Sequence, residues 1–135
     1  MLLHLHGLID DVNDLDVAVP VGSRDAVRTA SQAWWLGEVP AGGSVFASEW
    51  RVKLDVDGVR AHVFGGFALN IDGSRVELPA RSDHTIEVEG TPIALAPLVD
   101  WWLVYRETNP ERAALLEPVV APGARAQLLA ELGIA

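Results

Sequence analysis

The feature that most constrains the fold is a pair of alternating segments joined by Asp57-Gly58. Residues 50–56 and 59–64 each place apolar and polar side chains in strict alternation, which is typical of half-buried strands. Asp-Gly is the strongest two-residue signal for a β-hairpin, because both turn positions require positive φ. The predicted register pairs Val56 with Val59, Asp55 with Arg60, Leu54 with Ala61 and Lys53 with His62. One face of the hairpin is then aliphatic, and the other carries charged and polar side chains.

Helices and short strands are predicted on both sides of this hairpin. Pro20 would close a strand over residues 15–20, and Ser23 would cap a helix that runs to about Leu36, with Gly37 at its end. The other expected elements are a short helix at residues 2–8, strands near 67–71, 75–78 and 85–88, and helices starting at Pro97, Asn109-Pro110 and Gly123. This order predicts an α+β fold, with a mixed β-sheet flanked by helices and a helical C-terminal third.

Composition favours a single globular domain over residues 1–135 and argues against some partners. Half of the residues are hydrophobic, and the net charge is −9. Binding to DNA or RNA needs clusters of Lys and Arg, and only the short stretch Arg51-Val52-Lys53 is of that kind, so no nucleic acid partner is expected. No apolar run reaches the roughly 20 residues that cross a bilayer, so no membrane partner is expected. The chain has no cysteine and its first residues lack a signal-peptide pattern, so a cytoplasmic location is predicted.

Asp14 and Asp16 form the first candidate site. Alternate residues of a strand point to the same face, so the two carboxylates would lie side by side while their neighbours face a core. Carboxylates held that close repel each other, and a divalent cation between them relieves the repulsion. The alternative is a solvated acidic entrance to the strand, since a single Asp-x-Asp is a weak motif. His4 and His6 lack the i, i+4 spacing of a helical zinc pair.

The order of the predicted elements is informative as well. A helix ending near His6-Gly7, the strand with Asp14-x-Asp16 and a helix opening at Gly22-Ser23 are followed by the strands around Asp57-Gly58 and a C-terminal helix after Pro97. This order resembles the small nucleotidyltransferase domains of the DNA polymerase β superfamily, including its minimal and antibiotic-modifying members. The resemblance covers most of the chain, and Asp14-x-Asp16 is its one sharp motif.

The resemblance implies a metal-dependent transferase. In that family an Asp-x-Asp pair and a third carboxylate on a neighbouring strand hold two Mg²⁺ ions, which bind a nucleoside triphosphate and activate an acceptor hydroxyl. Asp14 and Asp16 would take over the metal-ligand roles. The third carboxylate is expected about where His62 stands, and Asp55 on the same predicted face is a second candidate. The Gly-Ser turn that precedes the motif in the family, and grips the triphosphate, has no counterpart in residues 1–13.

Two functions are compatible with these observations. The first is transfer of a nucleoside monophosphate from a nucleoside triphosphate to a hydroxyl of a small molecule or protein, with Asp14 and Asp16 as catalytic residues and Mg²⁺ as cofactor. The second is a catalytically inactive relative that keeps the fold as a binding or assembly module. In that case a homodimer would form through exposed aromatic surface at Trp35 or Trp50.

Overall fold

A computed structural model describes residues 2–8, 10–40 and 45–135 of the chain. The chain divides into two compact units, Met1–Ala80 and Arg81–Ala135, each with its own strands and helices. The predicted α+β class with a mixed sheet is confirmed. The single domain over residues 1–135 stays a prediction. None of the helices in the described ranges combines the length and apolar character needed to span a membrane.

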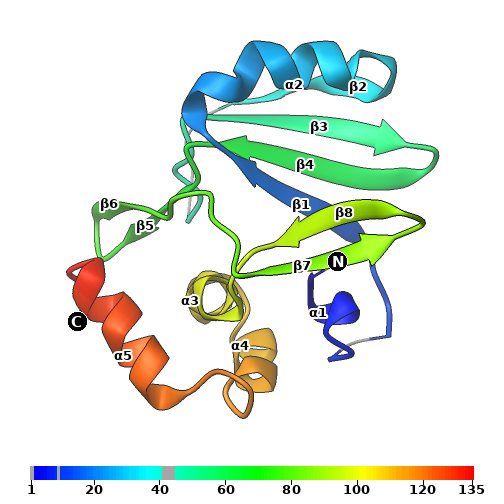
Figure 1. Cartoon of the computed structure of the whole chain (residues 1–135). Helices are drawn as coiled ribbons and strands as arrows, with labels where there is room; N and C mark the ends of the chain where they lie inside the picture. Colours follow the sequence, from blue (N-terminus) through cyan, green and yellow to red (C-terminus); the bar gives the residue numbers. More distant parts are fainter. Residues whose placement is uncertain (1, 9, 41–44) are drawn as a thin grey trace. The chain divides into compact units, whose positions relative to one another are not determined.

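The first unit is built around a mixed four-stranded sheet (Figure 1). Its strands, in spatial order, are β1 (Asp14–Val19), β4 (Val59–Gly65), β3 (Trp50–Val56) and β2 (Trp35–Val39). Strand β1 runs parallel to β4, and the other neighbouring pairs are antiparallel. A short helix, α1 (Leu2–Leu5), precedes β1. The parallel pair brings together two segments that are far apart in the sequence.

The hairpin β3–β4 has the predicted register at all four pairs. Asp57 and Gly58 have φ values of 53° and 88°, so both turn positions are left-handed, as a tight two-residue hairpin requires. The Asp55 carboxylate accepts a hydrogen bond from the Gly58 N–H at 2.7 Å and so stabilises the turn. Local turn chemistry therefore sets this register.

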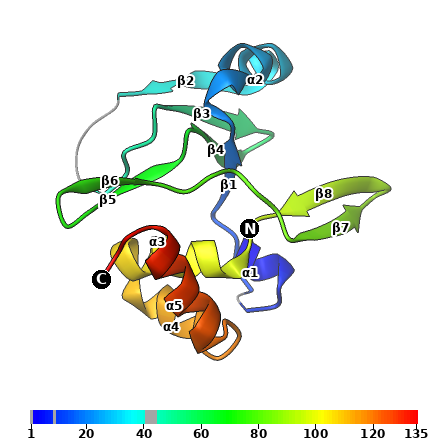
Figure 2. The same ribbon diagram turned by 60° about the vertical axis from the view of Figure 1, so that its left-hand side comes forward.

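A cluster of buried, mostly aliphatic side chains covers one face of this sheet. Val52, Leu54, Ala61 and Val63 are buried there, as predicted, whereas Val59 at the turn is exposed. Leu15 and Val17 of β1 pack against this row, and so does Val27 of helix α2 (Arg24–Ala30). Helix α2 lies alongside the sheet, next to β2 and β3 (Figure 2). The opposite face of the sheet carries the polar side chains of the alternating strands and also the buried ring of Phe64, which meets the ring of Phe67 edge-on.

Two predictions for residues 23–50 are wrong. The helix expected to reach Leu36 ends at Ala30, where the Ser31 hydroxyl donates to the Val27 carbonyl at 2.6 Å, and after a 3₁₀ turn (Gln32–Trp34) the chain enters β2. Pairing with the free edge of β3 outweighs the helical spacing of the apolar residues, since strand formation depends strongly on neighbours. Trp35 and Trp50 are not exposed aromatic surface, because Trp50 is 8% exposed and Trp35 packs against the core.

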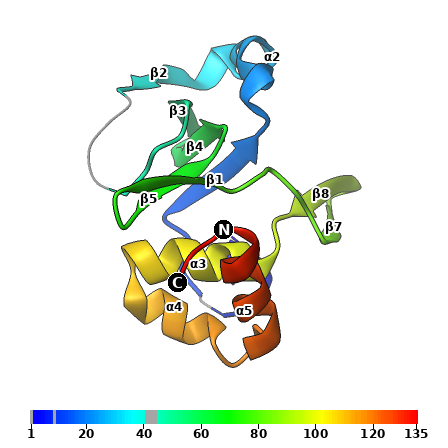
Figure 3. The same ribbon diagram turned by 90° about the vertical axis from the view of Figure 1, so that its left-hand side faces the viewer.

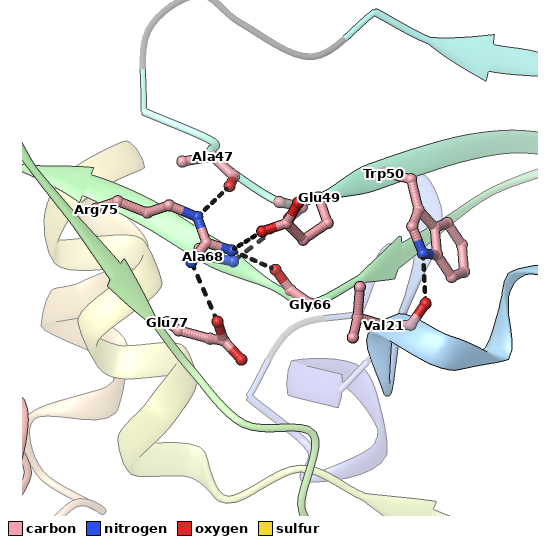
Figure 4. Close-up of polar contacts among 9 residues, drawn as sticks. Val21, Ala47, Glu49, Trp50, Gly66, Ala68, Arg75 and Glu77 are labelled. Atoms are coloured by element: carbon pink, nitrogen blue, oxygen red, sulfur yellow. Dashed lines mark hydrogen bonds and ion pairs between the residues drawn. The ribbon is translucent and has the colours of Figure 1, made fainter.

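A second hairpin, β5 (Ala68–Ile71) and β6 (Ser74–Glu77), is held to the sheet by Arg75 (Figure 4). The Arg75 guanidinium donates to the carbonyl of Ala47 at 3.0 Å and to that of Gly66 at 3.3 Å. It also pairs with the carboxylates of Glu49 and Glu77. One side chain thus connects β6 to the segments that border β3 and β4.

Trp50 closes one end of the sheet. Its indole N–H donates to the Val21 carbonyl at 2.8 Å, on the 3₁₀ turn Val21–Ser23 that follows β1 (Figure 4). The ring lies directly over Gly65 at the end of β4, in space that a Cβ at this position would occupy. A glycine is therefore needed at position 65 for steric reasons, so that the indole can reach the turn.

The second unit combines a hairpin with three helices. The hairpin pairs β7 (His84–Val88) with β8 (Thr91–Leu95), and the helices are α3 (Leu98–Thr108), α4 (Pro110–Leu116) and α5 (Pro122–Glu131). Helix α3 contacts both α4 and α5, and the three lie side by side in Figure 3. The Asn109 side chain accepts from the Arg112 N–H and caps α4, as the Asn-Pro signal predicts. Buried Trp102, Leu103, Leu116 and Leu128 form the interior.

Arg81 and Asp100 form a two-pronged ion pair at the start of α3. The guanidinium donates to the two carboxylate oxygens at 2.9 and 2.6 Å. The Asp100 side chain is 10% exposed, while that of Arg81 is 44% exposed. These hydrogen bonds raise the pKa of Arg81 above its usual range. The arginine thus compensates a carboxylate that is itself largely removed from water.

We expect Gly65→Ala to destabilise the first unit by about 1–3 kcal/mol, since the new methyl group must displace the Trp50 indole and break its bond to Val21. Gly22→Ala is the matched control, because a Cβ at Gly22 meets open space, and its effect should stay within about 0.5 kcal/mol. Urea unfolding followed by tryptophan fluorescence measures both. Equal midpoints for the two variants would contradict the proposed packing.

Arg81→Ala should cost about 1–2 kcal/mol, because it leaves the buried Asp100 carboxylate without its partner, although water can partly replace an exposed guanidinium. Arg24→Ala serves as the control, since Arg24 pairs with Glu38 at an exposed position and should contribute less than about 1 kcal/mol. Chemical denaturation of both variants tests the difference. A larger loss in Arg24→Ala would show that burial of Asp100 is not what matters.

Candidate metal centre

The candidate site lies on the polar face of strands β1 and β4. Asp14 and Asp16 are two residues apart on β1, so both side chains project from the face opposite to the core. The parallel register sets Asp16 beside His62 and Asp14 beside Arg60 on β4. The alternation that buries the aliphatic row therefore also brings two carboxylates and an imidazole to one place on the sheet.

The three side chains are close enough to share one cation. A donor atom from each of Asp14, Asp16 and His62 lies within 4.8 Å of the other two. The Nδ1 atom of His62 is 3.4 Å from Oδ1 of Asp16, and the two side chains are 17% and 28% exposed. Among the described residues (2–8, 10–40 and 45–135), Asp14, Asp16 and His62 form the one group of three or more His, Asp or Glu side chains with donor atoms this close together.

The electrostatics of the group favour an additional positive charge. Burial, and next the neighbouring Asp14 carboxylate, raise the pKa of Asp16 above its usual range. His62 acts in the opposite direction, through its charge and its hydrogen bond, and lowers that pKa without cancelling the rise. A cation held between the carboxylates would remove the repulsion that Asp14 exerts on Asp16.

The donor set fits a divalent metal ion. Two ligand atoms roughly 2.1 Å from one cation lie about 3.0–3.4 Å apart for right-angled to tetrahedral bonds, and the 3.4 Å between His62 and Asp16 falls in this range. Carboxylate oxygen and imidazole nitrogen are both common ligands of first-row divalent metals. A protonated His62 paired directly with Asp16 would have the same separation, so the geometry suits a cation or a proton at this position.

Asp55, the other predicted ligand, is not part of the group. Its carboxylate is engaged by the Gly58 N–H in the hairpin turn, and its place in the register is opposite Arg60. Sequence reasoning missed an aromatic neighbour of the site. The ring of Phe64, two residues after His62 on the same face of β4, meets the imidazole edge-on with centroids 6.2 Å apart. The alternation of β4 was the available signal for this contact.

Comparisons with known proteins give the fold. No protein-family model matches the sequence. No curated protein gives a significant sequence match. The structure is similar to a crystal structure described as a "putative nucleotidyltransferase" from Thermotoga maritima, with a TM-score of 0.63 and 16% sequence identity over 86% of this chain and 74% of that chain. Identity this low shows the fold alone. The predicted nucleotidyltransferase-like fold is confirmed.

We expect Asp16→Asn to stabilise the metal-free protein at pH 7. A raised folded-state pKa means that the folded protein holds this proton more tightly than the unfolded chain, so stability is lost as pH rises from the usual range of Asp through the folded-state pKa. Asp16→Asn removes the negative charge, so the variant keeps the stability that the wild-type protein loses as pH rises. Thermal unfolding in a chelating buffer should show a higher Tm for the variant at pH 7 and little difference near pH 3.

Asp11→Asn is the control, because Asp11 is an exposed carboxylate just before β1 and its substitution should change the Tm little at either pH. A Tm of Asp16→Asn below that of the wild type at pH 7 would mean that the ion pair with His62 stabilises the protein by more than burial of the charge and repulsion from Asp14 destabilise it.

Proposed function

We propose that this protein is a metal-dependent nucleotidyltransferase, which transfers a nucleoside monophosphate from a nucleoside triphosphate to a hydroxyl of a small molecule or protein. The observation that carries the proposal is the convergence of Asp14, Asp16 and His62 within 4.8 Å on β1 and β4 of a nucleotidyltransferase-like fold. The family resemblance assigns metal-ligand roles to the same two aspartates. Fold and donor geometry thus support one chemistry.

The residues of the site would hold and orient the reactants. Asp14, Asp16 and His62 would bind divalent metal, which neutralises charge on the triphosphate and lowers the pKa of the acceptor hydroxyl. The hydroxyl oxygen forms a bond to the α-phosphorus, and the bond from that phosphorus to the oxygen bridging the β-phosphate breaks. Pyrophosphate leaves with that oxygen, and the hydroxyl proton passes to a nearby base or water.

Two basic residues on the same sheet face support an anionic substrate. Lys53 stands opposite His62 on β3, and Arg60 stands beside Asp14 on β4. Directly paired residues project from the same face, and both side chains are exposed. In a chain of net charge −9, these cations next to the carboxylates suit the phosphates of a nucleotide. The overall negative charge favours a small or protein acceptor over a nucleic acid.

A second function is favoured by one observation. The residue next to Asp16 on β4 is a histidine, where the family resemblance expects a third carboxylate, and its Nδ1 lies at ion-pair distance. A protonated His62 would neutralise Asp16 and leave the site without a need for metal. The chain would then be a catalytically inactive binding or assembly module.

We expect Mg²⁺ or Mn²⁺ together with one of the four nucleoside triphosphates to raise the Tm of the wild-type protein. A ligand that binds the folded state alone stabilises by mass action, by about 2.7 kcal/mol at 100 times its Kd. The shift should vanish in Asp14→Asn/Asp16→Asn and persist in Asp10→Asn/Asp11→Asn, which removes two neighbouring exposed charges. Pyrophosphate release should be lost with the same double substitution at Asp14 and Asp16.

The absence of a shift with every triphosphate would contradict the transferase and favour the inactive module. A shift that survives in Asp14→Asn/Asp16→Asn would place nucleotide binding elsewhere on the chain.

A further inference from the structure

We propose that His62 makes this a mixed carboxylate–imidazole site that selects a first-row transition-metal ion of the Co²⁺ and Zn²⁺ class over Mg²⁺. The inference rests on the metal site of the proposed function and adds the class of its cation. Its basis is the position of His62, whose Nδ1 is 3.4 Å from Asp16 Oδ1 and whose neighbours in the group are both carboxylates. The structure thus offers one nitrogen and at least two oxygen donors to a cation.

The donor types determine the preference. Mg²⁺ takes oxygen ligands in a near-octahedral shell and gives up its water reluctantly, so an imidazole adds little to its binding. Imidazole nitrogen is a good ligand for Co²⁺, Ni²⁺, Cu²⁺ and Zn²⁺, for which affinity rises along the series to copper. With Mg²⁺, the group would act as a two-carboxylate site, whereas with a transition metal all three residues would bind.

The surrounding structure holds the imidazole in place. Strand β4 lies between β1 and β3, so the backbone at His62 is fixed by pairing with Asp16 on one side and Lys53 on the other. The ring packs edge-on against Phe64, and the side chain is 17% exposed. Binding therefore requires little ordering of this ligand, and a preorganised donor discriminates best between cations.

The expected effect is a change in a ratio of affinities, because nearly every protein site binds Co²⁺ more tightly than Mg²⁺ and the absolute order is uninformative. Titration of the full chain with Co²⁺, followed by competition with Mg²⁺, gives the two Kd values. Replacing the nitrogen donor by oxygen in His62→Asp should lower the preference for Co²⁺ by about tenfold or more. His84→Asp, the same change at an exposed position on β7 in the other unit, should leave the ratio unchanged.

A spectroscopic signal tests ligation directly. In the Co²⁺-loaded protein, a ring proton of a bound histidine gives a strongly shifted proton resonance. We expect one such histidine signal in the wild type and in His84→Asp, and none in His62→Asp. His62→Asn provides a second variant that adds no negative charge beside Asp14 and Asp16, and it should lose the signal as well. This readout does not depend on any transferase activity.

The outcomes distinguish a failure of the transition-metal preference from a failure of the proposed transferase. Cation binding with an unchanged ratio in His62→Asp, or without a shifted histidine signal, overturns the inference and leaves a carboxylate metal site. Absence of Co²⁺ and Mg²⁺ binding in both wild type and His62→Asp overturns the metal site and the proposed transferase together. Binding by His62→Asp but not by the wild type would show that His62 blocks the site, which overturns the inference and favours the inactive module.

Discussion

The parallel pairing of β1 with β4 is the constraint on which both the core and the candidate site depend. In this register Leu15 stands beside Ala61 on the core face, and Asp16 stands beside His62 on the other face. Because the side-chain period of a strand is two, a slip of β1 by one residue would turn Leu15 and Val17 away from the core and the two carboxylates toward it. Burial of apolar surface on one face therefore fixes the spacing of the candidate ligands on the opposite face.

Contacts outside the β1–β4 pairing stabilise the same register where these two strands end. The Gly66 N–H donates to the Val19 carbonyl at 3.3 Å, and the Trp50 indole reaches the Val21 carbonyl over the bare backbone of Gly65. These bonds join the ends of β1, β3 and β4. The glycines allow the backbone and the indole to approach that closely. Because β1 and β4 also carry the candidate site, this corner helps to hold the strands on which the site depends, although no residue of the corner belongs to the site.

Local signals were enough to predict those parts of the structure that form between near neighbours. Asp57-Gly58 determines the hairpin and its register, and the two-residue spacing of Asp14 and Asp16 determines that both share a face. The parallel partner of β1 has no local signal, since many strands of similar composition could serve, and the placement of His62 came from the family resemblance. Residues 35–39 show the same limit, because only the free edge of β3 decides that they form a strand. The structure adds the pairing of β1 with β4 and the 3.4 Å between His62 Nδ1 and Asp16 Oδ1.

The transferase and the inactive module differ in which positive charge balances Asp14 and Asp16. The Asp16 carboxylate is half-buried beside a second carboxylate, and that environment favours either a proton or a cation. His62 can supply the proton as an imidazolium, or its lone pair can bind a metal ion, but the same nitrogen cannot do both at once. Metal and proton therefore compete for one atom, and the fold is compatible with both results. A metal ion held by Asp14 and Asp16 is therefore compatible with the transferase whether or not His62 binds it, whereas a proton shared between His62 and Asp16 favours the inactive module.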